Sequence, residues 1–344
     1  FLMTGNWHRG LNMGDKMRIL VTGGAGFIGS NFVRYLLKKH QDYEIVVLDK
    51  LTYAGRKENL QDVWNKIVFI KGDIAKKEDV EKAVKNCDYI VNFAAETHVD
   101  RSILEAGTFV LTDIFGVYNL LEAARKYDVS KFEQVSTDEV YGHIVKGSFK
   151  EEDKPNPRNP YSASKAGAEL ICQSYFETYK LPIVITRSTN NYGPYQHPEK
   201  FVAKTIIYAL LNKPIPVYGT GKNVRDWLYV EDNCEAMDLV LHKSRNGEVY
   251  NIAGKKEIEN IDVAKKILEL LSKPKTLIQF VKDRPGHDLR YSLDTSKIES
   301  QLGWKAKVRF EEGMKKTIDW YVQNEWWWKP IIEKEQIDFH QKFS

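Results

Sequence analysis

Cysteine is scarce in this sequence: Cys87, Cys172 and Cys234 are the three cysteines among 344 residues. An odd number of widely spaced thiols fits neither a disulfide framework nor a metal site, and it favours a reducing compartment, so we expect a cytoplasmic protein without a bound metal. Long apolar runs are also lacking, because none approaches the roughly 18 residues of a membrane span. Residues 1–16 lack the apolar segment of a secretory signal, and we interpret them as a disordered extension or a remnant of expression.

A strong charge of one sign is lacking too. Lysine and arginine together number 51, aspartate and glutamate 47, and the formal net charge of +4 is small for this length. The lysines are scattered among acidic residues, so no basic stripe indicates binding to nucleic acid. An anionic small molecule is the more suitable partner. Hydrophobic residues at 42% and charged residues at 28% are ordinary values for a soluble globular protein.

Short apolar runs alternate with amphipathic segments along the first half of the chain. The expected strands lie at 18–21, 45–48, 67–70, 89–93, 132–135 and 183–185, and the expected helices at 27–37, 77–85, 105–126 and 161–179. Parallel strands need a crossover long enough to hold a helix, so the alternation predicts an α/β fold, a Rossmann-type doubly wound parallel sheet, over residues 17–190. Residues 191–344 have looser connections around helices expected near 200–211, 232–243 and 261–271. They predict a smaller second lobe that is interleaved with the first.

A glycine-rich turn follows the first expected strand. Gly23, Gly26 and Gly29 form G-x-x-G-x-x-G, and Gly24, Gly26 and Gly29 form G-x-G-x-x-G. Either match is weak alone, but here the turn opens a helix, whose backbone N–H groups and positive end hold a pyrophosphate. A plain strand-to-helix turn would need only one glycine. The turn therefore predicts a dinucleotide site.

Two carboxylates end the second and third expected strands. Asp49 lies about twenty residues beyond Gly29, where it can accept hydrogen bonds from ribose hydroxyls and repel a 2′-phosphate, which favours NAD over NADP. Lys50 and Arg56 lie nearby and could neutralise such a phosphate, so the preference depends mainly on Asp49. Asp73 could meet the adenine edge, and a helix N-cap is an equally good interpretation of it.

Tyr161 and Lys165 lie four residues apart at the start of an expected helix, so their side chains share one face. A tyrosine of reference pKa about 10 is a poor base near neutral pH, and we expect the charges of Lys165 and a nicotinamide ring to lower its pKa. A Y-x-x-x-K match alone is usually a solvated helix face. Combined with the glycine turn, it indicates a dehydrogenase that acts on a hydroxyl group.

Eight motifs follow one another between Met17 and about residue 324. They are ILVTGGAGFIGS, DKLTYAG, NFAAETHVDRS, QVSTDEVYG, NPYSASKA, NNYGPYQHPEK, NVRDWLYVED and RPGHDLRYSLD. In this order the chain resembles the extended short-chain dehydrogenases/reductases and, within them, the dTDP-glucose 4,6-dehydratases. The resemblance implies a lyase with tightly bound NAD, dTDP-glucose as substrate, and a second, substrate-binding lobe. It also implies a homodimer built through the helices at 105–126 and 161–179.

Thr137, Asp138 and Glu139 follow the fifth expected strand and distinguish a dehydratase from a simple epimerase. Eliminating water across C5 and C6 of a hexose needs a base for C5–H and an acid for the C6 hydroxyl, and two adjacent carboxyl groups can supply both. The resemblance implies Glu139 as base, Asp138 as acid, kept protonated by like-charge repulsion and burial, and Thr137 as a hydrogen-bond partner of the sugar. An acidic loop that caps a helix is the alternative.

The implied mechanism is a loan of hydride. Tyr161 takes the proton of the C4 hydroxyl while the C4 hydride passes to NAD⁺, and the resulting ketone acidifies C5–H. Glu139 removes that proton, Asp138 protonates the leaving hydroxyl, and NADH returns the hydride to C6 as C5 is reprotonated. The product is dTDP-4-keto-6-deoxyglucose, and no net redox change occurs.

The resemblance assigns further residues to the two ligands. The cofactor set is Gly23, Gly26, Phe27, Ile28, Gly29, Asp49, Lys50, Leu51, Thr52, Asp73, Ile74, Ala94, Ala95, Thr112, Tyr161, Lys165 and Asn191. The substrate set is Thr137, Asp138, Glu139, His98, Asn190, Lys200, Phe201, Pro216, Tyr218, Arg225, Asn260, Arg284 and His287. Within it, Arg225 and Arg284 can hold phosphate oxygens in a bidentate fork, and Lys200 can add a point charge.

One departure from the family pattern concerns the catalytic region. Asp113 stands where Asn is common, and an inward-pointing carboxylate there would disturb the pKa of Tyr161. Two other functions stay open on the sequence. The first is another nucleotide-sugar 4,6-dehydratase or an epimerase, acting on a UDP, GDP or CDP sugar. The second is a non-catalytic NAD-sensing or scaffold protein on the same fold, against which the joint presence of Tyr161, Lys165, Asp138 and Glu139 argues.

Overall fold

The computed structural model describes residues 16–283 and 287–335, which form two compact units. The first unit contains residues up to Val140, Pro155–Arg187 and Cys234–Tyr250. The second contains Tyr141–Lys154, Ser188–Asn233 and the residues from Asn251 on. Which ligand each unit serves stays a prediction. Within the described ranges, no helix combines the length and the apolar character that crossing a membrane requires.

The first unit is built on a seven-stranded sheet in the order β10-β6-β5-β4-β1-β2-β3. The strands are β1 (Arg18–Thr22), β2 (Glu44–Asp49), β3 (Ile67–Lys71), β4 (Tyr89–Asn92), β5 (Lys131–Thr137), β6 (Ile183–Ser188) and β10 (Val249–Ile252). β1 pairs in parallel with β2 and β4, β2 with β3, and β4 with β5. The order 3-2-1-4-5-6 is that of a doubly wound sheet, which confirms the predicted fold class.

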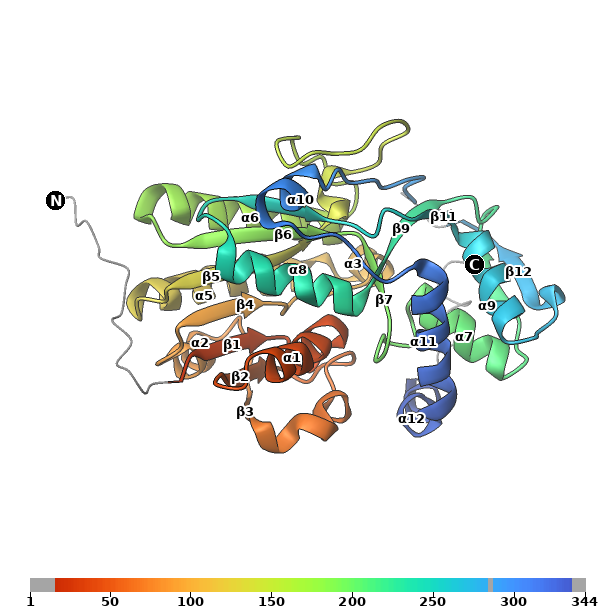
Figure 1. The fold of residues 1–344 in the computed structure, drawn as a ribbon, viewed down its shortest axis with the longest axis horizontal. Coiled ribbons are helices and arrows are strands. Elements are labelled where there is room, and N and C mark those ends of the chain that lie inside the picture. The colour runs from red at the N-terminus through yellow and green to blue at the C-terminus, as the bar shows by residue number, and fades with distance from the viewer. Residues whose placement is uncertain (1–15, 284–286, 336–344) are drawn as a thin grey trace. The chain divides into compact units, whose positions relative to one another are not determined.

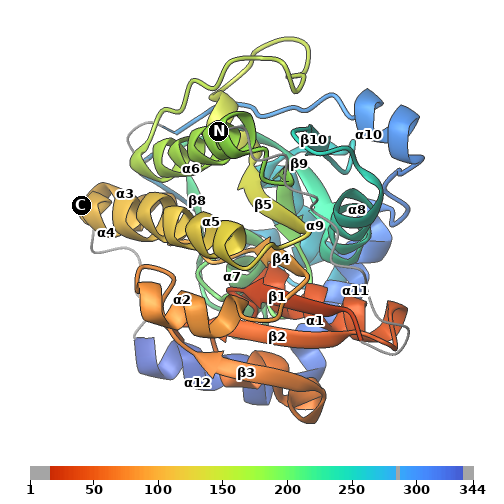
Figure 2. The same cartoon turned by 90° about the vertical axis from the view of Figure 1, so that its left-hand side faces the viewer.

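Helices cover both faces of this sheet (Figure 1). One face carries α2 (Lys77–Val84), α5 (Gly116–Lys126) and α6 (Pro160–Tyr179), and the other carries α1 (Phe27–Lys39) and α8 (Val230–Lys243), as Figure 2 shows. Apolar side chains of β1, β2, β4, β5 and β6 pack with those of α2, α5 and α6 in one buried cluster. The carboxyl ends of the strands meet at one edge of the sheet, which is where such folds bind their ligands.

Local signals fix the start of α6 and thereby place the two catalytic candidates. Asn159 caps the helix by accepting a hydrogen bond from the Ser162 N–H, and the Ser162 side chain accepts one from the N–H of Asn159 in return. Pro160 occupies the first helical turn, where its missing N–H costs nothing. Tyr161 and Lys165 therefore lie in the first turns of a well-defined helix, as predicted.

The helix predicted over 105–126 is interrupted. It divides into α4 (Ala106–Phe109), a π-helical turn η2 (Val110–Phe115) and α5, and it follows a short helix α3 (Val99–Leu104). π-helical turns are frequent at functional sites. This one carries Asp113, whose buried carboxylate accepts two hydrogen bonds from outside its own helix. Those tertiary contacts account for a break that helical periodicity does not reveal.

The second unit contains two small sheets. β11 (Glu257–Glu259), β9 (Val224–Tyr229) and β7 (Asn190–Tyr192) form one, and β12 (Ile278–Val281) pairs in parallel with β8 (Ile215–Tyr218) in the other. The helices are α7 (Phe201–Leu210), α9 (Asn260–Leu270), α10 (Ser296–Leu302), α11 (Phe310–Gln323) and α12 (Glu325–Glu335). A core of aromatic and aliphatic side chains from β7, β9, α7, α9, α11 and α12 holds the unit together.

Candidate active site

The predicted residues of the first unit gather at the carboxyl edge of its sheet. Gly23 follows β1, Asp49 ends β2, Asp73 follows β3, Ala94 follows β4 and Thr137 ends β5. Because these strands are parallel neighbours, residues that are distant in sequence reach the same edge. The structure thus brings together the predicted cofactor and catalytic positions of this unit.

Backbone conformation and close packing require glycine at two positions of the turn. Gly23 has φ +65°, and a side chain there would lie 2.6 Å from the backbone nitrogen of Ala94. A Cβ at Gly29 would lie 2.4 Å from the carbonyl oxygen of Gly23. Both distances are shorter than any real carbon contact. These glycines allow β1, α1 and the end of β4 to approach one another closely.

Gly26 has a different explanation. Among the described atoms, a Cβ at Gly26 would meet only the carbonyl oxygen of Gly23, at 3.2 Å, so internal packing does not demand glycine there. Gly26 is the N-cap of α1, and no side chain of the described chain caps that end. The N–H groups of Phe27 and Ile28 belong to the first turn, which has no acceptor within the helix. An uncapped helix N-terminus with an open glycine fits the pyrophosphate of a dinucleotide.

Asp49 links the end of β2 to the glycine turn. Its carboxylate accepts hydrogen bonds from the N–H of Ala25 at 2.9 Å and of Leu51 at 2.8 Å. Burial raises the pKa of Asp49, and these two amides partly offset the effect. Gly55 allows this approach, since a Cβ there would lie 2.4 Å from Asp49 Oδ1. The sequence reasoning missed Gly55, whose only signal is its place in the DKLTYAG motif.

The two cationic side chains near Asp49, Lys50 and Arg56, form ion pairs with acidic residues. Lys50 Nζ lies 2.8 Å from Asp73 Oδ2, and Arg56 lies 3.4 Å from Glu58. Burial raises the pKa of Asp73, but the hydrogen bond and charge of Lys50 outweigh it and hold the pKa below its usual range. The N-cap interpretation of Asp73 is wrong, because the N-cap of α2 is Lys76. The preference for NAD thus depends on Asp49, as the sequence suggests.

Tyr161 lies among carboxylates. Burial raises the pKa of Tyr161 well above its ordinary value. The negative charges of Glu139, Asp113 and Asp138 act in the same direction, and a hydrogen bond with Thr137 opposes them. The site by itself therefore keeps the phenol protonated.

Lys165 is buried beneath this group. Its Nζ donates a hydrogen bond to the carbonyl oxygen of Val135 at 2.8 Å. Burial lowers the pKa of Lys165, against the raising effect of the charges of Asp113 and Glu169. The chain's own groups therefore raise the pKa of Tyr161, because burial and the surrounding carboxylates dominate; the expected lowering by Lys165 together with a nicotinamide charge stays a prediction.

The predicted acid and base follow β5 on a single 3-10 turn, η3 (Asp138–Tyr141). Thr137 Oγ1 donates a hydrogen bond to Asp138 Oδ1 at 3.1 Å and accepts one from the Glu139 N–H at 3.3 Å. Asp138 is buried, whereas Glu139 is partly exposed and accepts a hydrogen bond from Asn159 Nδ2 at 3.5 Å. The threonine orients both acids, and both bear electrostatically on Tyr161.

Asp113 points into the site. Its Oδ2 accepts a hydrogen bond from Ser164 Oγ at 2.6 Å, and its Oδ1 accepts one from the N–H of Glu96 at 2.8 Å. Burial raises the pKa of Asp113 to about 6, although Lys165 and these hydrogen bonds lower it. The sequence reasoning missed Ser164 and Glu96, which have no signal beyond their place in two motifs.

The other predicted residues of this unit occupy the loops around the same edge. His98 is the N-cap of α3 at φ +85°, with Nδ1 3.9 Å from Asp100. The remaining cofactor positions follow β2, β3 and β4 or lie on η2; they are Leu51, Thr52, Ile74, Ala94, Ala95 and Thr112. Their contacts to a cofactor stay predictions.

Three predicted asparagines of the second unit have an unsatisfied amide oxygen. The Oδ1 atoms of Asn190, Asn191 and Asn260 are buried without a hydrogen-bond partner in the described part of the chain. A buried polar atom without a partner costs free energy. A ligand that donates hydrogen bonds could satisfy these oxygens, and the roles of the three asparagines stay predictions.

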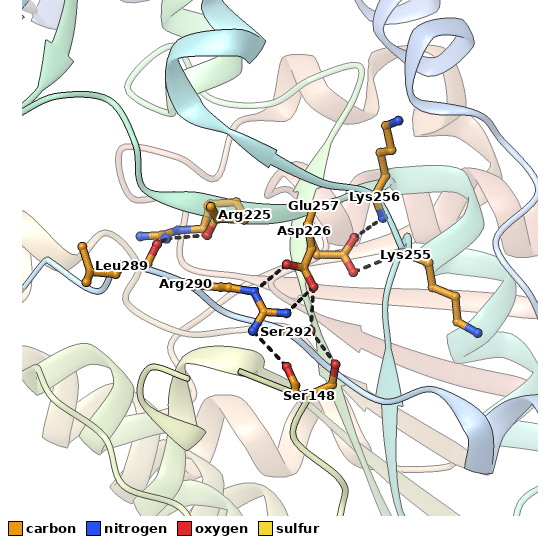
Figure 3. A network of polar contacts seen from close by, with 11 residues as sticks. Ser148, Arg225, Asp226, Lys255, Lys256, Glu257, Leu289, Arg290 and Ser292 are labelled. Atoms are coloured by element: carbon orange, nitrogen blue, oxygen red, sulfur yellow. Dashed lines mark hydrogen bonds and ion pairs between the residues drawn. The ribbon is translucent and has the colours of Figure 1, made fainter. Parts of the chain in front are cut away.

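Arg225 is held within the second unit (Figure 3). Its Nη1 donates to the carbonyl oxygen of Val224 at 2.8 Å and its Nη2 to that of Asp288 at 2.9 Å. The guanidinium lies 4.5 Å from the ring centre of Tyr291. These contacts orient the arginine, and its phosphate role stays a prediction.

A polar network lies beside Arg225 (Figure 3). Arg290 binds Glu257 through two hydrogen bonds of 2.6 and 2.7 Å and donates another to the carbonyl oxygen of Gly147 at 2.9 Å. Ser292 connects Glu257 to Ser148 through two hydrogen bonds of 2.7 Å each. The network joins the 141–154 segment to β11, which explains why this segment belongs to the second unit.

The other substrate candidates of the second unit lie on α7, β8 and the loop after β12. The ring centre of His287 lies 6.1 Å from that of Tyr218, and His287 Nδ1 lies 2.6 Å from Asp283 Oδ1. Lys200 is the N-cap of α7, Phe201 begins that helix and Pro216 lies on β8. Arg284 lies outside the described residues.

The chain is similar to nucleotide-sugar enzymes over most of its length. The family model of GDP-mannose 4,6 dehydratase matches residues 20–317. The chain is 46% identical over 334 residues to the dTDP-glucose 4,6-dehydratase of Haemophilus influenzae, covering 90% of this chain and 98% of that one. It is 52% identical over 308 residues to the low-salt glycan biosynthesis protein Agl12 of Haloferax volcanii, covering 89% and 99% of the two chains.

Solved structures show the same likeness. DesIV, a dTDP-glucose 4,6-dehydratase of Streptomyces venezuelae crystallised with NAD, superimposes with a TM-score of 0.90 at 45% identity, over 92% of this chain and 100% of that one. The UDP-glucose 4-epimerase of Thermus thermophilus in complex with NAD superimposes with a TM-score of 0.84 at 34% identity, over 90% of this chain and 100% of that one. Dehydratases and epimerases thus share this fold, so the side chains at the site have to distinguish them.

Proposed function

The chain belongs to the dTDP-glucose 4,6-dehydratases, within the family that the GDP-mannose 4,6 dehydratase model describes, and on this premise we propose that it dehydrates dTDP-glucose to dTDP-4-keto-6-deoxyglucose. NAD is its tightly bound cofactor. The observation that carries the proposal is the grouping of Thr137, Asp138 and Glu139 beside Tyr161. An oxidation at C4 needs only the tyrosine, whereas an elimination across C5 and C6 also needs an acid and a base.

The side chains at the site divide the tasks of the proposed reaction. Tyr161 takes the proton of the C4 hydroxyl, and Lys165 stabilises the phenolate that forms. Glu139, the more exposed of the two acids, removes the C5 proton once C4 is a ketone. Asp138, which is buried, gives its proton to the leaving C6 hydroxyl. Thr137 holds the two acids in place through its hydroxyl and binds the sugar.

The residues of the first unit suit NAD as the cofactor. Gly26 and the N-terminus of α1 would hold the pyrophosphate, and Asp49 the ribose hydroxyls. When bound, NAD supplies a positive nicotinamide ring that opposes the carboxylates around Tyr161 and a hydride acceptor that also returns the hydride. Burial and the chain's own carboxylates raise the pKa of Tyr161, and the charge of a bound nicotinamide would act in the opposite direction.

A product assay tests the function. The purified chain should convert dTDP-glucose to a 4-keto-6-deoxy product, whose enolate absorbs in the ultraviolet after addition of base. UDP-glucose, GDP-mannose and CDP-glucose are the competing substrates, and Tyr161→Phe is the matched inactive control. Product from another nucleotide sugar at a higher kcat/KM would reassign the substrate. A C4 epimer without dehydration would overturn the assignment of the acid and the base.

A second copy of the chain is the proposed partner. Exposed apolar side chains gather on α3, η2, α5 and α6; they are Leu104, Val110, Leu111, Phe115, Tyr118, Leu170 and Tyr179. Such a patch on a monomer is typical of an interaction surface. We expect a dimer by light scattering, and a monomer for Leu111→Glu combined with Leu170→Glu. A wild-type monomer at micromolar concentration would contradict the dimer.

A cytoplasmic location is also proposed. Nucleotide sugars are cytoplasmic substrates, and all three cysteines are buried thiols outside any disulfide, as expected in a reducing compartment.

A further inference from the structure

A cluster of metal-ligating side chains lies in the first unit at the end of the sheet opposite to the candidate active site. His40 directly follows α1, and Asp238 and His242 lie one turn apart on α8. Tyr43 immediately precedes β2, so the cluster lies where the strands begin. β2 has six residues, which span about 20 Å at ~3.3 Å per residue and separate the cluster from Asp49. The active site therefore does not account for it.

The ligand atoms are close enough to share one ion. Asp238 Oδ1 lies 2.8 Å from His40 Nε2 and 3.1 Å from His242 Nδ1. All three ligand atoms lie within 4.8 Å of one another. Bonds of ~2.1 Å in a tetrahedral site place ligand atoms about 3.4 Å apart. The two separations from Asp238 Oδ1 are shorter than this by about 0.6 Å or less, and the separation between the two imidazole nitrogens exceeds it by at most about 1.4 Å, so side-chain movements of this size would admit an ion.

Outer partners orient both imidazole rings. The Tyr43 hydroxyl lies 2.9 Å from His242 Nε2, which turns Nδ1 of that ring toward Asp238. The ring of His40 stacks on that of Tyr43 at 4.3 Å between centres, and the edge of Tyr89 meets His242 at 5.5 Å. A partner on the second ring nitrogen is a regular feature of metal-bound histidines. His242 thus has the outer contact of a metal-bound histidine, and ring stacking orients His40.

Hydrogen bonds occupy the same atoms when no ion is bound. His242 Nδ1 lies 2.8 Å from the carbonyl oxygen of Asp238, to which it donates a proton. A cation displaces that proton, and Nε2 then donates to the Tyr43 hydroxyl, which can either donate or accept. Lys131 is a cation whose charge bears on His242, and its Nζ is bound to the carbonyl oxygen of Ser244 at 2.6 Å. Burial lowers the pKa of Lys131 and so disfavours that charge, while Glu133 from the same strand raises the pKa.

We propose that His40, Asp238 and His242 bind a divalent transition-metal ion, with Zn²⁺ as the best match. Two imidazole nitrogens and one carboxylate suit Zn²⁺, whereas Mg²⁺ and Ca²⁺ prefer oxygen ligands. Water completes the coordination. The ion connects the end of α1 to α8 across 198 positions of the sequence. Its role is structural, because it binds the folded first unit and stabilises it by mass action.

Titration of the full chain tests the site, and it needs no dehydratase activity. The protein is stripped with a chelator and titrated with Zn²⁺ by calorimetry and with Co²⁺, whose visible absorption reports tetrahedral coordination. We expect one ion per chain, and a rise in Tm of roughly 5 °C at a hundredfold excess over Kd. His40→Gln and His242→Gln should each weaken binding at least tenfold. The matched control is His143→Gln, which removes a histidine 3.5 Å from Asp288 in the second unit and should bind as tightly as wild type.

Two outcomes overturn the proposal. One is a stripped wild-type chain that binds neither ion above the level of the two ligand variants. The other is wild-type affinity in His40→Gln, which would place the ion elsewhere. His40 lies at the end of a helix and is partly exposed, so this variant keeps the test valid even where His242→Gln does not fold.

Discussion

Asp113 provides the prediction whose magnitude follows most directly from the structure. The carboxylate is buried, and its pKa lies at about 6 instead of 3.8. At ~1.36 kcal/mol per pKa unit, the ionised form costs the folded state about 3 kcal/mol. The folded pKa is the higher one, so this cost grows as the pH rises from 3.8 and is complete above pH 6. Asp113→Asn removes the charge and keeps the shape.

The two hydrogen bonds of Asp113 survive the substitution. The amide oxygen still accepts from the Glu96 N–H, and the amide nitrogen can donate to Ser164 Oγ, because a hydroxyl rotates to accept. We therefore expect Asp113→Asn to raise Tm by about 3–6 °C at pH 8 and by about a third of that at pH 4.5. The acidic limb of the pH profile of kcat should also move to lower pH, because the substitution removes the negative charge of Asp113, which raises the pKa of Tyr161.

Differential scanning fluorimetry across this pH range is the assay, and Asp226→Asn is the control. Burial also raises the pKa of Asp226 to about 6, but its two oxygens accept from the N–H groups of Lys255 and Lys256 at 3.1 Å each. An amide has only one oxygen, so one of these bonds is lost, and its loss offsets the relief of charge. Asp226→Asn should therefore melt below wild type at pH 4.5 and gain less Tm than Asp113→Asn at pH 8. The reasoning fails if Asp113→Asn changes Tm equally at pH 4.5 and pH 8, or lowers it at both.

Two further predictions concern the cofactor site. Gly26→Ala should reduce NAD affinity at least tenfold. The Tm of the free chain should change little, because the added Cβ meets only one backbone oxygen, at 3.2 Å, among the described atoms. Wild-type affinity in a calorimetric titration would contradict the pyrophosphate assignment. Gly55→Ala should lower both NAD affinity and Tm, since its Cβ would lie 2.4 Å from Asp49 Oδ1. Gly107→Ala is the control, because a Cβ there has no described neighbour within 4 Å. Equal effects of the two variants on NAD affinity and Tm would refute the argument.

The sequence predicts the first unit well because its signals are local. A run such as Ile45–Leu48 is apolar on both faces, as a buried parallel strand must be, and Asn159 with Pro160 fixes a helix start within a few residues. The glycine turn and the Tyr161 and Lys165 pair depend on spacing along one strand or helix. Features of this kind need no knowledge of the rest of the chain.

Features that depend on distant contacts could not be predicted in this way. The π-helical turn at Val110–Phe115 accompanies the hydrogen bonds of Asp113 to Glu96 and Ser164, which are 17 and 51 positions away. Burial raises the pKa of Tyr161, and carboxylates from η2 and η3 raise it further. The histidines of the proposed metal site are too far apart along the chain to form a motif.

The central claim is that Glu139 removes the C5 proton after oxidation at C4. Glu139→Gln keeps the size of the side chain and its contact with Asn159 but cannot accept a proton. With dTDP-glucose in D₂O, the variant should accumulate NADH, release no 4-keto-6-deoxy product and incorporate no deuterium at C5, while the wild-type enzyme incorporates one. Deuterium at C5 at the wild-type rate in this variant would contradict the account.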